Sequence, residues 1–296
     1  MEDIFCRSCG AYLKPAQSFC ASCGTARGCL QQPVDPGRIW AWRQVGITPG
    51  PPCGKMVVAG DRLYLAWSDR QHSGGVVSIE RTNGEVAWSI ATQPVGDGGV
   101  LLDSAGLFFT TRGFLDQAGE IICCDPIRGT VCWKKSFSGV AWSAPLLVDE
   151  VRLLITTDRG QNLCYDARSG DLVGNVILPE IRGKIWHVMM DGKIIAISET
   201  GKIMLLEHHR GGDRCEILVD LKTTLTSAPA CANGQLYLGS KDGRLFQINL
   251  RSREKRVLGD GFKRILSTPR IDSNLLMVGG FDHCLHAFDL RNGEEA

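Results

Sequence analysis

Residues 121–136 read IICCDPIRGTVCWKKS, an apolar run, a turn and a second run that carries a tryptophan. The first four residues favour a buried strand, and the segment DPIRG holds the Asp, Pro and Gly that favour a turn. The second run, TVCWKKS, favours another strand with Trp133 near its middle. The stretch therefore predicts two strands joined by a turn that runs from Asp125 to Gly129.

The same order of strand and turn occurs six times along the chain, at steps of 40–45 residues. The other five segments are VVSIERTNG (76–84), NLCYDARSG (162–170), IMLLEHHRG (203–211), LFQINLRSR (245–253) and CLHAFDLRNG (284–293). The turn glycine or its equivalent falls at Gly84, Gly129, Gly170, Gly212, Arg253 and Gly293. Each unit holds about four short apolar strands, and no segment shows a helical period. Four short strands about every 40 residues are the signature of a β-propeller blade.

The last unit stops at its turn, and the strand that it lacks is found at the other end of the repeats. Residues 38–45, RIWAWRQV, resemble EVAWSIAT at 85–92, and matching the Ala-Trp pair of each segment puts Trp42 on Trp88. An N-terminal strand that completes the last blade would close the ring and remove both sheet edges. We therefore predict an all-β fold in which residues 38–296 form a six-bladed β-propeller of four-stranded blades, closed by strand 38–45.

The pattern of Asp125, Gly129 and Trp133, D-x-x-x-G-x-x-x-W, resembles the pyrroloquinoline-quinone-like repeat family, also called the quinoprotein-like fold. The resemblance covers nearly all of 38–296 and weakens in the fourth and fifth units. There the Asp is replaced by Glu207 or Asn249, and the Trp by Glu216 or Val257. We expect the repeat tryptophans to be structural and to pack between neighbouring blades.

The chain begins with a doubled cysteine motif, FCRSCG at 5–10 and FCASCG at 19–24. Cys6, Cys9, Cys20 and Cys23 form two C-x2-C pairs, which can supply four thiolates to a tetrahedral zinc ion. Free cysteines or two disulfides are the alternatives. The motif resembles the small zinc-ribbon family, which implies one structural zinc without an open position. We predict a zinc ribbon at 1–25 and a linker at 26–37, which carries two prolines.

Composition limits the function classes. Lys plus Arg number 33 and Asp plus Glu 32, a balance that gives no case for nucleic acid as a partner. We identify no signal peptide and no apolar run long enough to span a membrane, so membrane insertion is not expected. The chain has 13 cysteines, several of them within apolar runs. This usage fits free thiols in a reducing compartment and predicts a cytoplasmic protein.

Catalytic signals are weak. The resemblance includes quinone-dependent dehydrogenases, which hold the quinone over a channel tryptophan beside a calcium ion and a vicinal disulfide. Cys123 and Cys124 would be such a pair, but they fall within a predicted strand, and we expect them to be ordinary strand residues. His187 has no carboxylate partner that the sequence identifies. His283 and Cys284 should point to opposite faces of a strand, which disfavours a joint metal site.

We therefore predict no catalytic residues, no bound quinone and a non-enzymatic function: an intracellular scaffold that binds one or more proteins, with the ribbon as an adaptor. A quinone-dependent oxidoreductase is the alternative. Segments such as SAP (143–145) begin the innermost strands and mark one face of the ring. The longer loops of that face include Phe114 and Leu115, apolar residues at a loop tip. We take these two residues, with Trp142 and Trp186, as candidate partner-binding residues.

Overall fold

The computed structural model describes residues 52–69, 73–113, 117–178, 181, 183–207 and 214–295. In these residues the regular structure consists of twenty-three strands and no helix, so none of them forms a helix that could cross a membrane. The chain divides into two units, 1–43 with 82–85 and 44–81 with 86–296. All the described strands belong to the second unit. The predicted zinc ribbon, linker and closing strand lie outside the described residues.

The strands form six groups, and within each group antiparallel neighbours follow one another in chain order. Group 1 consists of β1 (Pro52–Ala59), β2 (Arg62–Ser68), β3 (Gly74–Glu80) and β4 (Val86–Thr92). Group 2 consists of β5 (Val95–Asp103), β6 (Gly106–Thr111), β7 (Gly119–Cys124) and β8 (Val131–Phe137). Group 3 consists of β9 (Leu146–Leu147), β10 (Arg152–Thr156), β11 (Gln161–Asp166) and β12 (Leu172–Ile177). Group 4 consists of β13 (Ile185–Met190), β14 (Lys193–Ser198), β15 (Lys202–Glu207) and β16 (Arg214–Asp220). Group 5 consists of β17 (Ala230–Ala232), β18 (Gln235–Gly239), β19 (Leu245–Asn249) and β20 (Lys255–Gly259). Group 6 consists of β21 (Arg270–Asp272), β22 (Leu275–Gly279) and β23 (Leu285–Asp289).

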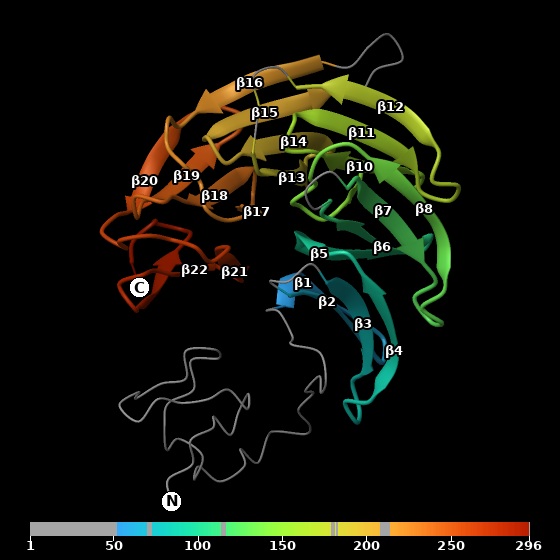
Figure 1. The fold of residues 1–296 in the computed structure, drawn as a ribbon. Coiled ribbons are helices and arrows are strands. Elements are labelled where there is room, and N and C mark those ends of the chain that lie inside the picture. Colours follow the sequence, from blue (N-terminus) through green and yellow to red (C-terminus); the bar gives the residue numbers. More distant parts are fainter. Residues whose placement is uncertain are drawn as a thin grey trace, which may run out of the picture. The chain divides into compact units, whose positions relative to one another are not determined.

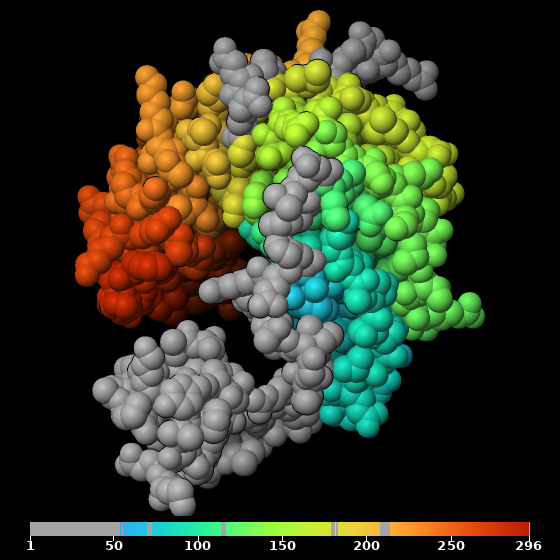
Figure 2. Space-filling model, viewed as in Figure 1, coloured from blue at the N-terminus to red at the C-terminus, as the bar shows by residue number. Residues whose placement is uncertain are grey.

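Figure 1 shows the groups side by side in chain order, with the first strand of each group innermost and the last strand outermost. The space-filling view shows the same succession of groups as packed surfaces (Figure 2). Groups 1 and 2 also share a sheet through a parallel pair between Lys55 of β1 and Gly99 of β5. This is the strand order predicted for consecutive propeller blades.

A separate hydrophobic cluster lies between each pair of consecutive groups. Phe109 packs toward group 1, whereas the adjacent Phe108 packs toward group 3. The same alternation continues with Leu153 and Leu154 in group 3. Because side chains of a strand alternate between its two faces, the central strands of a group contribute to two clusters. Continuous apolar runs such as LLIT are therefore explained by burial on both faces.

The adjacent cysteines of β7 follow this alternation. Cys123 packs in the cluster between groups 2 and 3, and Cys124 in the cluster between groups 1 and 2. Both are free and buried, and burial raises the pKa of each thiol to about 12. The prediction that they are strand residues with opposite orientations is confirmed.

The aspartate of the repeated turn holds the turn in shape. Asp125 Oδ1 accepts hydrogen bonds from the backbone nitrogens of Ile127 and Arg128, each at 2.8 Å. These hydrogen bonds lower the pKa of the exposed Asp125 carboxyl. In group 5 the side-chain oxygen of Asn249 accepts hydrogen bonds from the two corresponding nitrogens. An amide can replace the carboxylate there because the turn needs only an acceptor.

The repeat tryptophans pack on the turn of the next group. Trp88 in β4 donates its indole N–H to the carbonyl of Pro126, at 3.0 Å, and Trp133 in β8 donates to Ala167, at 3.1 Å. A Cβ atom added to Gly129 would lie 2.6 Å from the Trp88 ring. Gly170 faces Trp133 at the same distance. The predicted structural role of these tryptophans is confirmed, and the glycine leaves room for the ring.

Groups 4 and 5 use a different pair at the same two positions. Glu216 takes the place of the tryptophan, and Arg253 takes the place of the glycine. Their side chains form an ion pair at 2.7 Å, and both are about half exposed. Arg253 keeps the left-handed backbone of the turn, with φ of 61°. The contact between groups is therefore retained here with polar chemistry.

The tryptophan–glycine contact can be separated from backbone strain by comparing two glycines. Gly129 and Gly192 both have φ of 71°, but Gly192 has no atom within 4 Å of an added Cβ. We expect Gly192→Ala to cost about 1–2 kcal/mol for the left-handed backbone alone. Gly129→Ala should cost roughly 1–3 kcal/mol more, because the methyl group displaces Trp88. Urea unfolding of both variants measures the difference, and equal losses would contradict the contact.

Candidate functional site

The segment before β9 is fixed closely against group 2. The carbonyl of Trp142 accepts a hydrogen bond from Gly98 N, at 2.9 Å. A Cβ atom on Gly98 would lie 1.6 Å from the backbone nitrogen of Ala144, so only glycine permits this approach. Trp142 is thereby held just before β9, the innermost strand of group 3.

Two cations lie against the Trp142 ring. The Arg112 guanidinium carbon is 5.1 Å and the Lys184 ammonium 4.8 Å from the ring centroid. Asp97 joins the two cations, with its carboxylate oxygens 3.6 Å from Arg112 and 2.6 Å from Lys184. We call Asp97, Arg112, Trp142 and Lys184 the Trp142 cluster. Its members come from groups 2, 3 and the start of group 4, and three of them are charged.

The Trp142 cluster combines an aromatic ring with charged side chains that are partly exposed. Arg112 is 26% exposed, Lys184 38% and Asp97 42%, so the charged groups remain hydrated. Such pairs contribute only about 0–1 kcal/mol to stability. Two cations, one anion and an aromatic ring leave a net positive surface that can contact a carboxylate of a partner. Arginine and tryptophan are also the side chains most enriched at interface hot spots.

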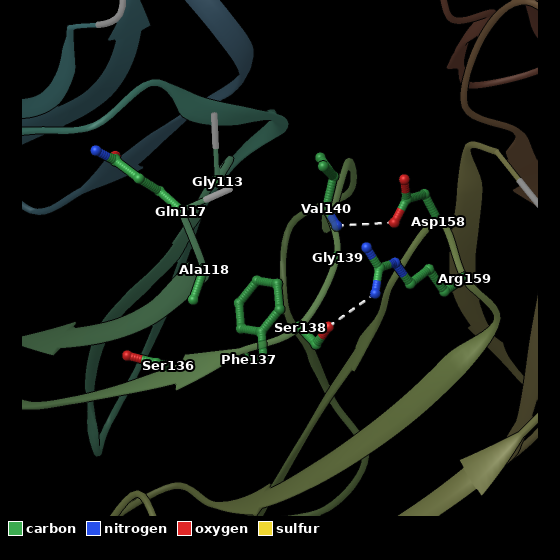
Figure 3. A pocket seen from close by; sticks show the side chains of 10 residues that line it. All are labelled: Gly113, Gln117, Ala118, Ser136, Phe137, Ser138, Gly139, Val140, Asp158 and Arg159. Atoms are coloured by element: carbon green, nitrogen blue, oxygen red, sulfur yellow. Dashed lines mark hydrogen bonds between the residues drawn. The ribbon is translucent and has the colours of Figure 1, made fainter. Parts of the chain in front are cut away.

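A pocket of about 520 Å³ lies between the loops of groups 2 and 3 (Figure 3). Gly113, Gln117, Ala118, Ser136, Phe137, Ser138, Gly139, Val140, Asp158 and Arg159 line it. Arg159 donates to the Ser138 hydroxyl at 3.1 Å, and Val140 N donates to the Asp158 carboxylate at 2.8 Å. We call this the loop pocket. Val140 also forms a bridge with Arg112, so the loop pocket adjoins the Trp142 cluster.

The candidate partner-binding residues fall in different surroundings. Phe114 and Leu115 lie outside the described residues, between Gly113 and Gln117 of the loop pocket. Trp142 is the centre of the cluster named after it. Trp186, in β13, is partly buried and packs against the hydrophobic cluster between groups 4 and 5. The predicted role of all four in partner binding stays a prediction.

His187, also in β13, has a polar partner but no acidic one among its described contacts. Its Nε2 lies 2.7 Å from Thr156 Oγ1, and that hydroxyl donates to Asn162 at 2.5 Å. Burial lowers the pKa of His187 to about 4, so the ring is neutral at pH 7. This geometry matches a partly buried structural histidine rather than an acid–base pair.

One side-chain cluster was missed from the sequence. Asp282, Cys284 and His286 bring possible metal ligands together in group 6. Sequence reasoning compared Cys284 with its neighbour His283, and therefore disfavoured a joint site. Asp282 and Cys284 lie in the turn before β23 and His286 lies in β23, so the shape of the turn, which the sequence does not give, brings the three side chains together. His283 is not part of this cluster, so the expectation about His283 and Cys284 stays a prediction.

Comparison with known proteins places this geometry in a fold and a family. The sequence pattern of the family described as outer membrane protein assembly factor BamB matches residues 72–296. A search of curated proteins gave no match.

Among solved structures, BamB from Moraxella catarrhalis is similar, with a TM-score of 0.61 and 18% identity over 82% of this chain and 71% of that one. The C-terminal WD40 domain of Sif2 has a TM-score of 0.61 and 16% identity, over 81% of this chain and 67% of that one. The Neurospora crassa Pan2 WD40 domain has a TM-score of 0.60 and 12% identity, over 82% of this chain and 77% of that one. Likenesses at this identity show the fold alone, which is propeller-like. Because the family pattern covers more than half of the sequence, the chain belongs to the family described as outer membrane protein assembly factor BamB.

Proposed function

We propose that this protein is a non-enzymatic scaffold whose propeller binds other proteins through the face that carries the Trp142 cluster and the loop pocket. The observation that carries the proposal is the joining of Arg112, Trp142 and Lys184 from different strand groups into one partly exposed surface. The family description, which concerns a protein assembly factor, supports a protein as the ligand. The partner chemistry that fits is an acidic segment with an aromatic or apolar anchor.

Site-specific photocrosslinking in cells of the source organism tests this proposal. A photoreactive residue at Ala118, an exposed residue of the loop pocket, should give discrete protein adducts that excess unlabelled chain abolishes. The matched control is Glu150, an exposed residue in the β9–β10 turn at the other end of group 3. Adducts at both positions alike, or at neither, would contradict the proposed binding face.

We propose further that residues 38–45 complete group 6 and close a ring of six blades. Leu285 in β23 is 73% exposed, whereas its counterpart Leu245 in group 5 is fully buried, so the last group has an uncovered apolar position. Glu295 forms a bridge with Phe288, as Val131 pairs with Cys124 in group 2. In this register a strand at 38–45 would pair with β23, and Trp42 would face Gly84 as Trp88 faces Gly129.

This closure makes Gly84 equivalent to Gly129. Gly84 has φ of 77°, close to the 71° of Gly129. We expect Gly84→Ala to destabilise the protein by as much as Gly129→Ala does. In a chain that already carries Trp42→Ala, Gly84→Ala should cost little more than the left-handed backbone alone, as in Gly192→Ala. Urea unfolding measures both effects. A Gly84→Ala loss no larger than that of Gly192→Ala would exclude closure by Trp42.

The zinc ribbon at 1–25 remains a proposal, in which Cys6, Cys9, Cys20 and Cys23 bind one structural zinc and the module acts as an adaptor in the cytoplasm. Free cysteines in the described residues support a reducing compartment. Replacing all four ligands by Ser should remove one zinc per chain and leave the melting transition of the strand groups unchanged. Loss of that transition together with the zinc would contradict a separate module.

A quinone-dependent oxidoreductase is the alternative, and the described residues do not fit it well. Asp97, the carboxylate that contacts both cations of the Trp142 cluster, is already neutralised by Arg112 and Lys184. It is therefore poorly placed to hold the calcium ion that such enzymes use. We derive no reaction step through a quinone. A visible absorption spectrum and mass spectrum of the purified protein distinguish the two functions, since a bound quinone would overturn the scaffold.

A further inference from the structure

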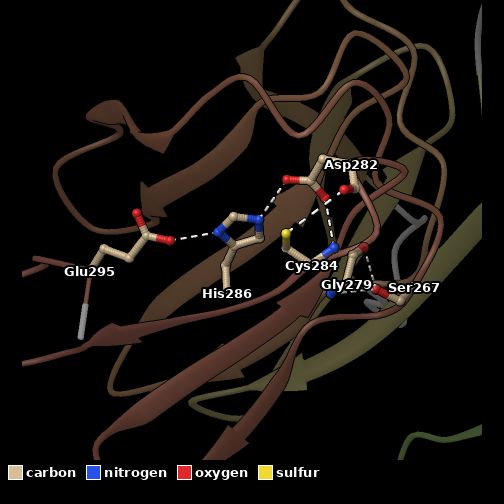
Figure 4. Close-up of polar contacts among 6 residues, drawn as sticks. All are labelled: Ser267, Gly279, Asp282, Cys284, His286 and Glu295. Carbon is tan, nitrogen blue, oxygen red and sulfur yellow. Dashed lines mark hydrogen bonds and ion pairs between the residues drawn. The ribbon is translucent and has the colours of Figure 1, made fainter.

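The turn between β22 and β23, together with the start of β23, presents three side chains of different chemistry at alternate positions: Asp282, Cys284 and His286. Asp282 and Cys284 lie in the turn, where His283 between them has φ of 68°, and His286 is the second residue of β23. One carboxylate oxygen, the Cys284 sulfur and one imidazole nitrogen all lie within 4.8 Å of one another (Figure 4). These are the three donor types that zinc accepts in proteins.

Hydrogen bonds already orient two of the three donors. Asp282 Oδ2 lies 2.7 Å from His286 Nε2, and Asp282 Oδ1 accepts a hydrogen bond from the backbone nitrogen of Cys284 at 3.2 Å. Gly280 leaves space for the carboxylate, since a Cβ atom there would lie 2.5 Å from Asp282 Oδ1. The cluster is thus ordered by its own turn and not by a chance approach of surface side chains.

A second carboxylate holds the opposite side of the imidazole. Glu295 Oε1 lies 2.5 Å from His286 Nδ1, and the edge of the Phe262 ring packs on the imidazole with 4.5 Å between ring centroids. Histidines that bind metals through one nitrogen nearly always donate the other N–H to a carboxylate, carbonyl or water. Glu295 therefore fixes the tautomer that presents Nε2 toward Asp282 and Cys284.

The repeat itself supplies a comparison. In group 5 the equivalent positions hold Asp242, Arg244 and Phe246. Arg244 donates to the Asp242 carboxylate at 2.9 Å and lies over the Phe246 ring at 5.2 Å. Group 6 keeps the aspartate but has a thiol in place of the guanidinium and an imidazole in place of the phenyl ring. The internal cation is lost, and two donor atoms that can bind metal stand in its place.

Burial and geometry suit a small cation. The Asp282 and His286 side chains are 19% and 17% exposed, while Cys284 is exposed, so the cluster is partly dehydrated yet open to solvent. Tetrahedral ligands of zinc lie about 3.3–3.7 Å apart, given metal–ligand distances of about 2.0–2.3 Å. The three atoms need only small movements to reach this spacing. We propose that Asp282, Cys284 and His286 bind one Zn²⁺ ion, with Glu295 as the positioning residue for His286.

Without metal, a proton takes its place. The hydrogen bond to Glu295, followed by that to Asp282, raises the pKa of His286. Binding of Zn²⁺ would release the proton between Nε2 and Asp282 together with the thiol proton of Cys284. Three protein ligands leave one tetrahedral position for water or for a donor from another molecule. This site differs from the proposed ribbon in ligands, position and open coordination.

Cobalt titration of the full-length chain tests the site. All variants carry Ser at Cys6, Cys9, Cys20 and Cys23, so the outcome does not depend on the proposed ribbon. We expect one Co²⁺ per chain with a thiolate-to-cobalt charge-transfer band, which Zn²⁺ removes by competition. Cys284→Ser should abolish the band, and His286→Gln should weaken binding at least tenfold. Glu295→Gln should weaken it by about 10–100-fold, as expected for a positioning carboxylate.

Cys231→Ser is the matched control, because Cys231 is another exposed free thiol and lies on β17. It should leave the band and the affinity unchanged. Circular dichroism verifies that each variant keeps its strands. Absence of a bound cobalt ion, or a band that survives Cys284→Ser, would show that only the proton bridges these groups and would overturn the proposal.

Discussion

The contact between the outer strand of one group and the turn of the next is the interaction on which the arrangement of the sheets depends. Trp88 and Trp133 each cover a glycine and donate the indole N–H to a carbonyl of the following turn. A single four-stranded sheet has two apolar faces that it cannot bury alone. Between groups 1 and 2 and between groups 2 and 3, the tryptophan contact adds a directional hydrogen bond to the hydrophobic cluster that the two groups share.

The binding surface follows from that fixed arrangement. Asp97, Arg112, Trp142 and Lys184 come from strand groups that are joined by shared hydrophobic clusters and by local backbone contacts such as the Gly98–Trp142 hydrogen bond and the Arg112–Val140 bridge. Their distances are therefore set by how groups 2, 3 and 4 pack, and not by any one loop. The cluster in group 6 is different, because Asp282, Cys284 and His286 belong to one turn and its strand. It needs only the local backbone, with Glu295 as the single ligand-orienting group from further along the chain.

Much of the fold could be predicted from sequence, because each repeat has turn residues that mark where its strands end. The Asp125–Gly129 turn and Trp133 gave the strand order, the role of the tryptophans and the strand position of Cys123 and Cys124. The surface was harder to predict. The approach of Lys184 to Asp97 spans 87 residues and depends on the packing of groups. The ion pair of Glu216 with Arg253 could not be predicted without knowing how groups 4 and 5 pack. In the sequence, each of the two residues only departs from the repeat pattern.

The central claim is that the same position pair couples groups 1 and 2, groups 2 and 3, and groups 4 and 5, through tryptophan and glycine at the first two junctions and through an ion pair at the third. Its most direct test is the coupling energy between Glu216→Trp and Arg253→Gly, measured by urea unfolding of the two single variants and the double variant. Neither single variant should make the protein more stable. Glu216→Trp places the new ring against Arg253, and Arg253→Gly leaves Glu216 without its ion-pair partner. The double variant should be more stable than the sum of the singles by at least about 1 kcal/mol, in the range seen for contacting residues. Additivity within about 0.3–0.5 kcal/mol, typical of independent sites, would contradict the account.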